Sequence, residues 1–214
     1  MFTPYTFSRG GCQEVSGIRG YHHGDLGAAL IDAGLQLTRL GGPEALTVRE
    51  ATRRVGVSPN AAYRHFADRE ELLRAVAVAI WDRMAARMSP PATNRGTPQS
   101  RARNQLRAVG LGYIGFALDE PGWFTVAFFG SGVTAIGDGQ VPPPFRALVE
   151  ALDALADTGV LQPKRRMGAE WPCWSAVHGF AELALRGPLH GAPRPDLDAL
   201  AQRTVDDIIS GLVG

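Results

Sequence analysis

Apolar residues recur every three or four positions along most of this chain, which is the spacing of one face of an α-helix. In the first part of the chain the pattern predicts helices over residues 25–40, from Val48 to Gly56, from Pro59 onward and over 69–88. The same spacing farther on predicts helices over 101–118, 121–129, 144–158, 168–186 and 195–213, with loops at 89–100 and 130–144. The sequence therefore predicts an all-α protein.

Two capping boxes mark helix starts within residues 47–73. Thr47 precedes Glu50 by three residues, and Asp68 precedes Glu71 by the same spacing. In such a box the first side chain accepts a hydrogen bond from a free amide of the first helical turn, and the acidic side chain reaches back. These pairs predict that one helix starts at Val48 and another just after Asp68.

A third helix start lies between these two. Gly56 is suited to end the first helix, because glycine tolerates the left-handed conformation found at helix C-termini. Ser58 is then expected to be the next N-cap, with Pro59 at the first helical position. Only three residues separate the two short helices, so the helices cannot lie in line. The segment predicts a helix-turn-helix.

The second short helix divides into an inner and an outer face. Ala62 and Phe66, four residues apart, are expected to point toward a small core. On the outer face, Arg64 is suited to pair with guanine, Asn60 with adenine, and Ala61 to touch a thymine methyl group. This face therefore predicts contacts in the major groove of DNA, and the alternative is a solvated face on an ordinary helical hairpin.

Several neighbouring side chains suit contacts to the DNA backbone. Tyr63, His65 and Arg69 are expected to contact phosphates, together with the hydroxyl groups of Thr47 and Ser58. The complete predicted DNA-contacting set is Thr47, Arg49, Ser58, Asn60, Ala61, Tyr63, Arg64, His65 and Arg69.

Residues 21–75 resemble the DNA-binding domain of the TetR family of transcriptional repressors, most clearly in the segment YRHFADREELL. The resemblance implies all-helical homodimers with an N-terminal domain that binds an operator and a C-terminal domain that binds a small molecule that releases the DNA. It places the phosphate-contacting Tyr and His of the family on Tyr63 and His65, and the usual Lys on Arg69. The later segment WSAVHGF resembles a Trp, His, Gly pattern in the C-terminal domain of one TetR subgroup.

These observations predict three parts. Residues 1–20 form a flexible N-terminal arm, rich in glycine and serine, which either orders on DNA through Arg9 or Arg19 or is a disordered or wrongly assigned leader. Residues 21–68 form the helix-turn-helix domain, and residues 69–214 form a C-terminal ligand-binding and dimerisation domain. The helix over 69–88 belongs to both and connects them.

Composition limits the chemistry. With 214 residues, 45% of them hydrophobic, the chain can bury a sizeable core, and its net charge of +1 requires that any DNA-binding basicity be local. The two cysteines, Cys12 and Cys173, have no metal-ligand spacing and suggest no disulfide, which fits a reducing cytoplasm. Residues 1–20 contain no apolar run long enough for a signal peptide or membrane span. We therefore expect a cytoplasmic protein with no metal, cofactor or membrane partner.

Aromatic residues concentrate in the second half of the chain and suggest a site for a small apolar or aromatic effector. The predicted ligand-binding set is Tyr113, Phe116, Trp123, Phe124, Phe128, Trp174 and His178. The alternative is that these rings only fill a core. His178 could bind the effector, pair with Glu182 as an acid–base or metal site, or be a hydrogen-bonded core or interface histidine. No nucleophile or phosphate-binding loop accompanies it, so we predict no enzyme and no catalytic residue.

The last two predicted helices have broad apolar stripes and are expected to form a four-helix homodimer interface with a second copy. Two recognition helices could then read a palindromic double-stranded DNA operator, about one DNA turn apart. The prediction is a ligand-responsive repressor in which the effector tilts the helix over 69–88. One alternative is a regulator whose C-terminal domain only dimerises or binds a protein, and a more remote one is a helical-bundle enzyme.

Overall fold

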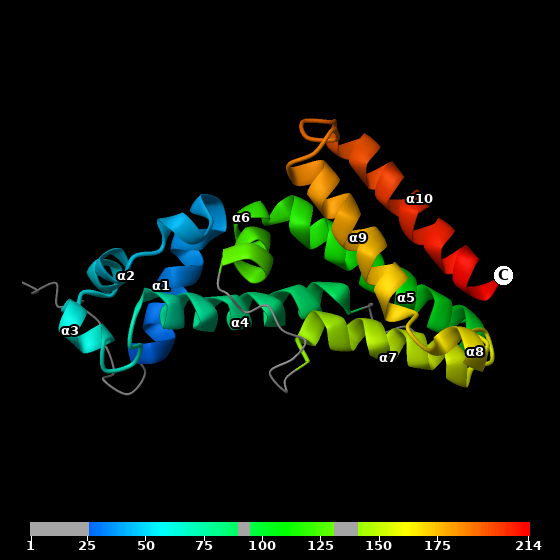
Figure 1. Cartoon of the computed structure of the whole chain (residues 1–214), viewed down its shortest axis with the longest axis horizontal. Coiled ribbons are helices and arrows are strands. Elements are labelled where there is room, and N and C mark those ends of the chain that lie inside the picture. Colours follow the sequence, from blue (N-terminus) through cyan, green and yellow to red (C-terminus); the bar gives the residue numbers. More distant parts are fainter. Residues whose placement is uncertain (1–25, 90–94, 131–140) are drawn as a thin grey trace, which may run out of the picture.

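The computed structural model describes residues 26–89, 95–130 and 141–214, and all regular elements in these ranges are helical (Figure 1). The N-terminal elements are α1 (Leu26–Gly41), the 3₁₀ helix η1 (Pro43–Ala45), α2 (Val48–Val55) and α3 (Pro59–Ala62). They are followed by α4 (Arg69–Met88), α5 (Pro98–Asp119), α6 (Pro121–Thr125), the π-helix η2 (Val126–Gly130), α7 (Pro143–Asp157), α8 (Pro163–Arg166), α9 (Glu170–Leu185) and α10 (Arg194–Val213). The predicted all-α fold is confirmed. The predicted arm over residues 1–20 lies outside the described residues.

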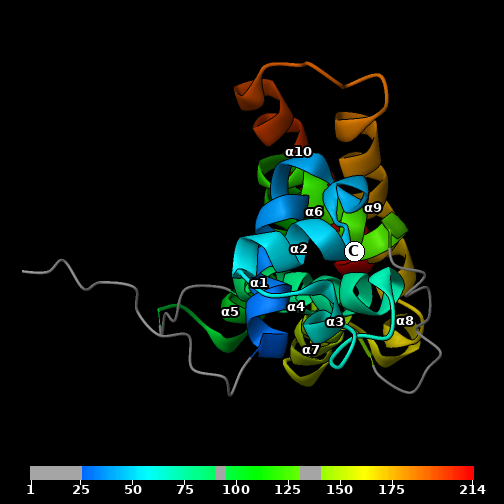
Figure 2. The ribbon, with the colours of Figure 1, turned by 90° about the vertical axis from the view of Figure 1, so that its left-hand side faces the viewer.

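The N-terminal helices form a small three-helix unit on the first turns of α4. Its core is built from the apolar faces of these helices, including Leu30, Leu46, Ala51 and Leu73, none of which is exposed. In Figure 2, where the N-terminal helices face the viewer, α2 and α3 lie in front of the helical bundle. The helix-turn-helix is therefore at one end of the molecule.

The C-terminal helices pack around α5, which contacts α4, α7, α9 and α10. Tyr113, Ile114 and Phe116 of α5 are at most 2% exposed, so this helix is the centre of the bundle. Helices α9 and α10 lie side by side on the opposite side of α5 from α4 (Figure 1).

Helix α4 is the rod that joins the two parts. Its 20 residues span about 30 Å. Leu72 and Leu73 are buried near its start, in the N-terminal unit, whereas Met84 and Met88 are buried in the bundle. One rigid helix therefore carries both parts of the molecule.

The close contact between α4 and α5 depends on Gly112. A Cβ atom at this position would lie 2.5 Å from the carbonyl oxygen of Arg87 and 2.7 Å from the Cα atom of Met88. Only glycine allows the two backbones to approach this closely. The C-terminal end of α4 is therefore fixed against the central helix of the bundle.

Several helix ends lie one or two residues from the predicted positions, η1 and α8 were not predicted, and three other differences are larger or change the type of helix. Helix α5 begins at Pro98, three residues earlier than predicted, because the side chain of Thr97 caps it by accepting a hydrogen bond from the Ser100 amide at 3.2 Å. The aromatic segment after Pro121 changes from an α-helix to a π-helix at Val126. Helix α3 is only four residues long.

Candidate DNA-binding surface and effector region

The first helix of the helix-turn-helix starts and ends as its residues dictate. The Oγ1 atom of Thr47 accepts a hydrogen bond from the Glu50 amide at 3.1 Å, and Gly56 ends α2 with a left-handed φ of 78°. The Glu50 side chain binds Arg53 at 2.7 Å, and hydrogen bonding from Arg53 lowers the pKa of Glu50 to about 2. The predicted N-cap is confirmed, and the acidic side chain pairs with an arginine of its own helix.

Ser58 occupies the N-cap position of α3 with extended backbone angles, but its side chain makes no capping hydrogen bond. Pro59 supplies the first helical residue and needs no amide partner there. The Ser58 hydroxyl remains on the exposed surface of the turn. The hydroxyl is therefore accessible for its predicted contact with DNA.

The predicted recognition face is exposed. Asn60, Tyr63, Arg64 and His65 are all exposed, Ala61 is half-buried, and Ala62 faces the core with only 1% exposure. Tyr63, Arg64 and His65 lie in a turn after α3, closed by a hydrogen bond of 2.9 Å from the His65 amide to the Ala62 carbonyl. Arg49 and Thr47 are also exposed, at the start of the preceding helix.

Arg69 differs from the other members of the predicted DNA-contacting set. Its Nε atom donates to the Leu46 carbonyl at 2.7 Å, and its Nη2 atom donates to the Pro43 carbonyl at 2.6 Å. The third guanidinium nitrogen pairs with Glu70. Arg69 thus connects the start of α4 with the segment between α1 and α2.

Five of the seven predicted ligand-binding residues come together in the bundle. Tyr113, Phe124, Phe128, Trp174 and His178 form one ring cluster, in which the centroids of Tyr113 and Trp174 lie 5.1 Å apart. The Tyr113 hydroxyl and His178 Nδ1 share a hydrogen bond of 2.8 Å. This cluster joins α5, α6, η2 and α9.

The other two predicted residues, Phe116 and Trp123, stack on each other outside this cluster, with centroids 6.3 Å apart. Trp123 donates through Nε1 to the Leu35 carbonyl at 2.8 Å, and the guanidinium groups of Arg39 and Arg83 lie over its ring. Trp123 therefore joins α6 to α1 and to α4, a contact between segments that sequence spacing alone does not connect.

Burial sets the electrostatics of the ring cluster. Burial lowers the pKa of His178, Glu182 opposes this effect, and Arg186 adds to it. Burial also raises the pKa of Tyr113 well above its ordinary value. The Glu182 carboxylate pairs with Arg186 at 2.8 Å, so its nearest partner is an arginine of its own helix. Both Tyr113 and His178 are therefore neutral near pH 7.

An apolar cavity of about 20 Å³ lies beside the cluster, between the end of α4 and helices α5, α7, α9 and α10. Tyr113 and Trp174 are the two predicted residues that line it. The sequence did not single out the other lining residues, which are Met88, Leu106, Val109, Gly110, Leu148, Cys173, Val177, Val205, Ile208 and Ile209. The helical spacing of most of them predicted an apolar helix face, and only the packing of five helices identifies the set as a cavity wall. The volume suits roughly one water molecule.

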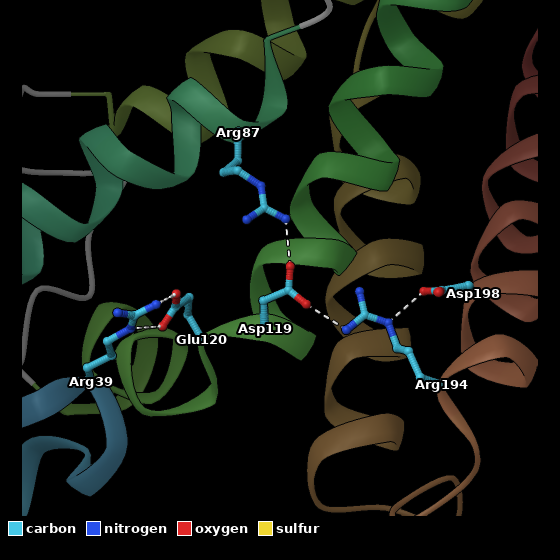
Figure 3. Close-up of polar contacts among 6 residues, drawn as sticks. All are labelled: Arg39, Arg87, Asp119, Glu120, Arg194 and Asp198. Atoms are coloured by element: carbon cyan, nitrogen blue, oxygen red, sulfur yellow. Dashed lines mark hydrogen bonds and ion pairs between the residues drawn. The ribbon is translucent and has the colours of Figure 1, made fainter.

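A chain of ion pairs connects three helices at the far end of α5 (Figure 3). Asp119 binds Arg87 of α4 at 2.7 Å and Arg194 of α10 at 2.5 Å, and Arg194 also binds Asp198. Burial alone would raise the pKa of Asp119, but the hydrogen bonds from both arginines lower it overall. The end of α5 thus holds the connecting helix and α10 together.

The next residue, Glu120, holds the N-terminal unit. Its carboxylate accepts two hydrogen bonds from Arg39 at the end of α1, at 2.6 and 2.7 Å (Figure 3). Beside it, a Cβ atom on Gly122 would lie 2.3 Å from the Arg39 carbonyl oxygen. Backbone contact and an ion pair therefore join α6 to α1.

Among the described residues, no group of three His, Cys, Asp or Glu side chains could hold a metal ion. None of the described helices has the length and apolar character needed to cross a bilayer.

Two family models match the sequence. One, described as bacterial regulatory proteins of the tetR family, matches residues 30–76, and the other, described as a tetracyclin repressor-like C-terminal domain, matches residues 106–208. No curated protein matches the sequence.

Solved structures share the fold over most of the chain. A protein of unknown function from Rhodococcus sp. RHA1 is 25% identical, covers 91% of this chain and 98% of its own, and has a TM-score of 0.66. A TetR variant from Acinetobacter baumannii AYE, in complex with minocycline, is 24% identical over 86% and 94% of the two chains, with a TM-score of 0.61. A regulator from Pectobacterium atrosepticum is 19% identical over 87% and 93%, with a TM-score of 0.62. The chain belongs to the TetR family of transcriptional regulators, with an N-terminal helix-turn-helix domain and a C-terminal helical domain.

Proposed function

We propose that this regulator is a homodimeric repressor that binds a palindromic DNA operator in the cytoplasm and is released by a small apolar or aromatic effector. The observation that carries the DNA-binding part is the exposed row of Asn60, Tyr63, Arg64 and His65 on a helix-turn-helix whose inner face is buried. In this proposal Arg64, Asn60 and Ala61 read base edges. Backbone contacts come from Tyr63, His65, Thr47, Ser58 and Arg49.

The proposed dimer uses the outer faces of α9 and α10. Leu183 and Leu200 are 45% and 42% exposed in the single chain, and a Cβ atom at Gly179 would meet nothing within 4 Å. Exposed leucines on two adjacent helices suit pairing with the same surface of a second copy. The pairing would set two recognition helices at a fixed spacing for two half-sites.

The proposed effector binds at the apolar cavity and the adjoining ring cluster. The lining is almost wholly apolar and has no cationic side chain, which favours a neutral ligand. Met88 lines the cavity at the last residue of α4, whose first turns pack in the helix-turn-helix domain. An effector that enlarges the cavity would therefore displace α4 and alter the spacing of the recognition helices.

A second candidate is a regulator without a small-molecule effector, whose C-terminal domain only dimerises or binds a protein partner. The cavity volume of about 20 Å³ favours this candidate, because a drug-sized ligand needs several hundred Å³. The thermodynamic linkage between effector binding and DNA binding distinguishes the two candidates. A compound that raises the melting temperature and causes release must bind the DNA complex more weakly than the free protein. Equal affinities for every stabilising compound would favour the second candidate.

Selection of bound duplexes from a random DNA pool tests the DNA-binding proposal. We expect a palindrome with two half-sites about one helical turn or slightly more apart. Arg64→Ala should lose discrimination at particular base pairs by about 1–3 kcal/mol. Arg146→Ala, which removes an exposed arginine on α7, is the matched control and should keep the preference of the unaltered protein. Failure to enrich any duplex would contradict the proposal.

A further inference from the structure

Arg69 is the first residue of α4, and its side chain reaches back across more than twenty residues of sequence. Nε and Nη2 donate to the carbonyl oxygens of Leu46 and Pro43 at 2.7 and 2.6 Å, and the remaining nitrogen pairs with Glu70. The side chain is 32% exposed. Each guanidinium nitrogen therefore has a partner within the protein.

The two carbonyl groups lie immediately before α2. Pro43 begins η1, and Leu46, which is fully buried, precedes the N-cap residue Thr47. Arg69 therefore joins the start of α4 to the start of α2. The turn and α3 lie between these two points in the sequence, so the bridge closes the loop that carries the recognition residues.

The position is unfavourable for a cation without such partners. The N-terminal end of a helix carries partial positive charge, which disfavours an arginine in the first turn. Two carbonyl oxygens and a carboxylate offset this effect for Arg69. The planar guanidinium can bind both carbonyls at once, whereas a lysine ammonium lacks this rigid fork.

We propose that Arg69 is a positioning residue, which fixes the recognition segment relative to α4 and does not itself contact a DNA phosphate. The proposal rests on the proposed DNA binding and adds the route by which the orientation of α4 is imposed on the helix-turn-helix. The proposal predicts that the planar guanidinium of Arg69 matters more for DNA affinity than its positive charge does.

The test compares Arg69→Lys and Arg69→Ala with the unaltered full-length protein. The probe is a duplex enriched from a random pool by the unaltered protein, and its affinity is measured over a range of KCl concentrations. We expect both variants to bind at least about tenfold more weakly, because the lost hydrogen bonds involve a charged donor. The slope of log affinity against log salt should stay the same, since no phosphate contact is lost.

A direct phosphate contact gives the opposite pattern. Arg69→Lys would then bind like the unaltered protein, and Arg69→Ala would lower the slope by about 0.9 per protomer. Either result overturns the proposal, as does unchanged affinity in both variants. Arg49→Ala is the matched control, because Arg49 is an exposed arginine on the same domain that is proposed to face the DNA backbone. Its loss should lower the slope.

Hydrogen exchange provides a readout that needs no DNA. In both Arg69 variants, the amides of Glu50 and Ala51 at the start of α2 should exchange faster than in the unaltered protein. Unchanged exchange at these amides overturns the positioning role. If Arg69→Ala does not fold, Arg69→Lys decides the question. If the unaltered protein enriches no duplex, the proposed function fails, and the exchange measurement still tests Arg69.

Discussion

Thr47 and Ser58 hold the same position at the starts of neighbouring helices, but their hydroxyl groups have different partners. Thr47 accepts a hydrogen bond from the Glu50 amide, whereas the Ser58 side chain makes no capping hydrogen bond. The Ala61 amide, one of the two that such a cap would bind, instead donates to the carbonyl oxygen of Ser58 at 3.0 Å. Thr47 therefore stabilises the start of its helix, whereas the Ser58 side chain does not.

We predict that Thr47→Ala lowers the free energy of unfolding by about 1 kcal/mol, because it removes a helix cap. Ser58→Ala should change it by less than about 0.5 kcal/mol, because the residue is exposed and its side chain caps nothing. Denaturant unfolding of the two variants measures both values. Equal losses would contradict this assignment.

His178 predicts a pH dependence of stability. Burial lowers its pKa in the folded protein, Glu182 opposes the effect and Arg186 adds to it. Below about pH 6.5 the unfolded chain therefore binds more protons than the folded one. The contribution of neutral His178 to the free energy of unfolding is therefore complete above about pH 6.5. It is lost as the pH falls through the lower pKa that His178 has in the folded protein.

The melting temperature of the unaltered protein should therefore fall more steeply between pH 7 and pH 5 than that of His178→Gln. His65→Gln, which changes an exposed histidine, is the control and should keep the steep dependence. Parallel curves for the unaltered protein and His178→Gln would show that another group controls the acid response.

At the scale of elements, the sequence predicted those helix boundaries that depend on residues close together in the chain. Thr47, Gly56 and Asp68 act on amides or carbonyls within four residues of themselves, so their helix boundaries can be predicted from spacing. Trp123 instead donates a hydrogen bond to the carbonyl of Leu35, 88 residues away, and stacks on Phe116 outside the ring cluster, a position that its sequence spacing does not indicate. The cavity wall could not be predicted from spacing either, because it exists only where five helices meet.

Gly112 gives a prediction for the packing of α4 on α5. Gly112→Ala should destabilise the protein by about 1–3 kcal/mol, since its methyl group would meet backbone atoms that cannot move aside. Gly115→Ala, one turn later in the same helix, is the control. A Cβ atom there has its nearest neighbour at 3.7 Å, so this change should stabilise the helix by up to about 1 kcal/mol. Thermal unfolding compares the two, and equal effects would contradict the close contact.

At the scale of the whole molecule, the recognition turn and the proposed dimer surface lie far apart (Figure 1). They are linked by α4, by the ion pairs of Asp119 with Arg87 and Arg194, and by the pair of Glu120 with Arg39. The helix-turn-helix and the all-α class could be predicted from the sequence. The ion pairs could not, because each joins residues that are more than thirty positions apart in the sequence.

The dimer proposal predicts that Leu183→Glu and Leu200→Glu are monomeric, because each places a carboxylate in an apolar interface. Their affinity for an enriched duplex should fall by at least about a hundredfold, since the two half-sites are no longer bound together. Val78→Glu is the control, because Val78 on α4 is also exposed, at 49%, but lies outside the proposed interface. Sedimentation equilibrium measures the assembly, and three identical masses would contradict the interface.

The small volume of the apolar cavity has a consequence for sensitivity. For the proposed effector, the conformation able to accept it is a minority of the free protein, so the measured affinity equals the intrinsic affinity scaled by the open fraction. Substitutions that loosen the packing of α4, α5 and α10 would then increase the response without touching the ligand. In such a regulator, the effector concentration needed for release depends on how strongly the packing of the free helical bundle favours the small cavity.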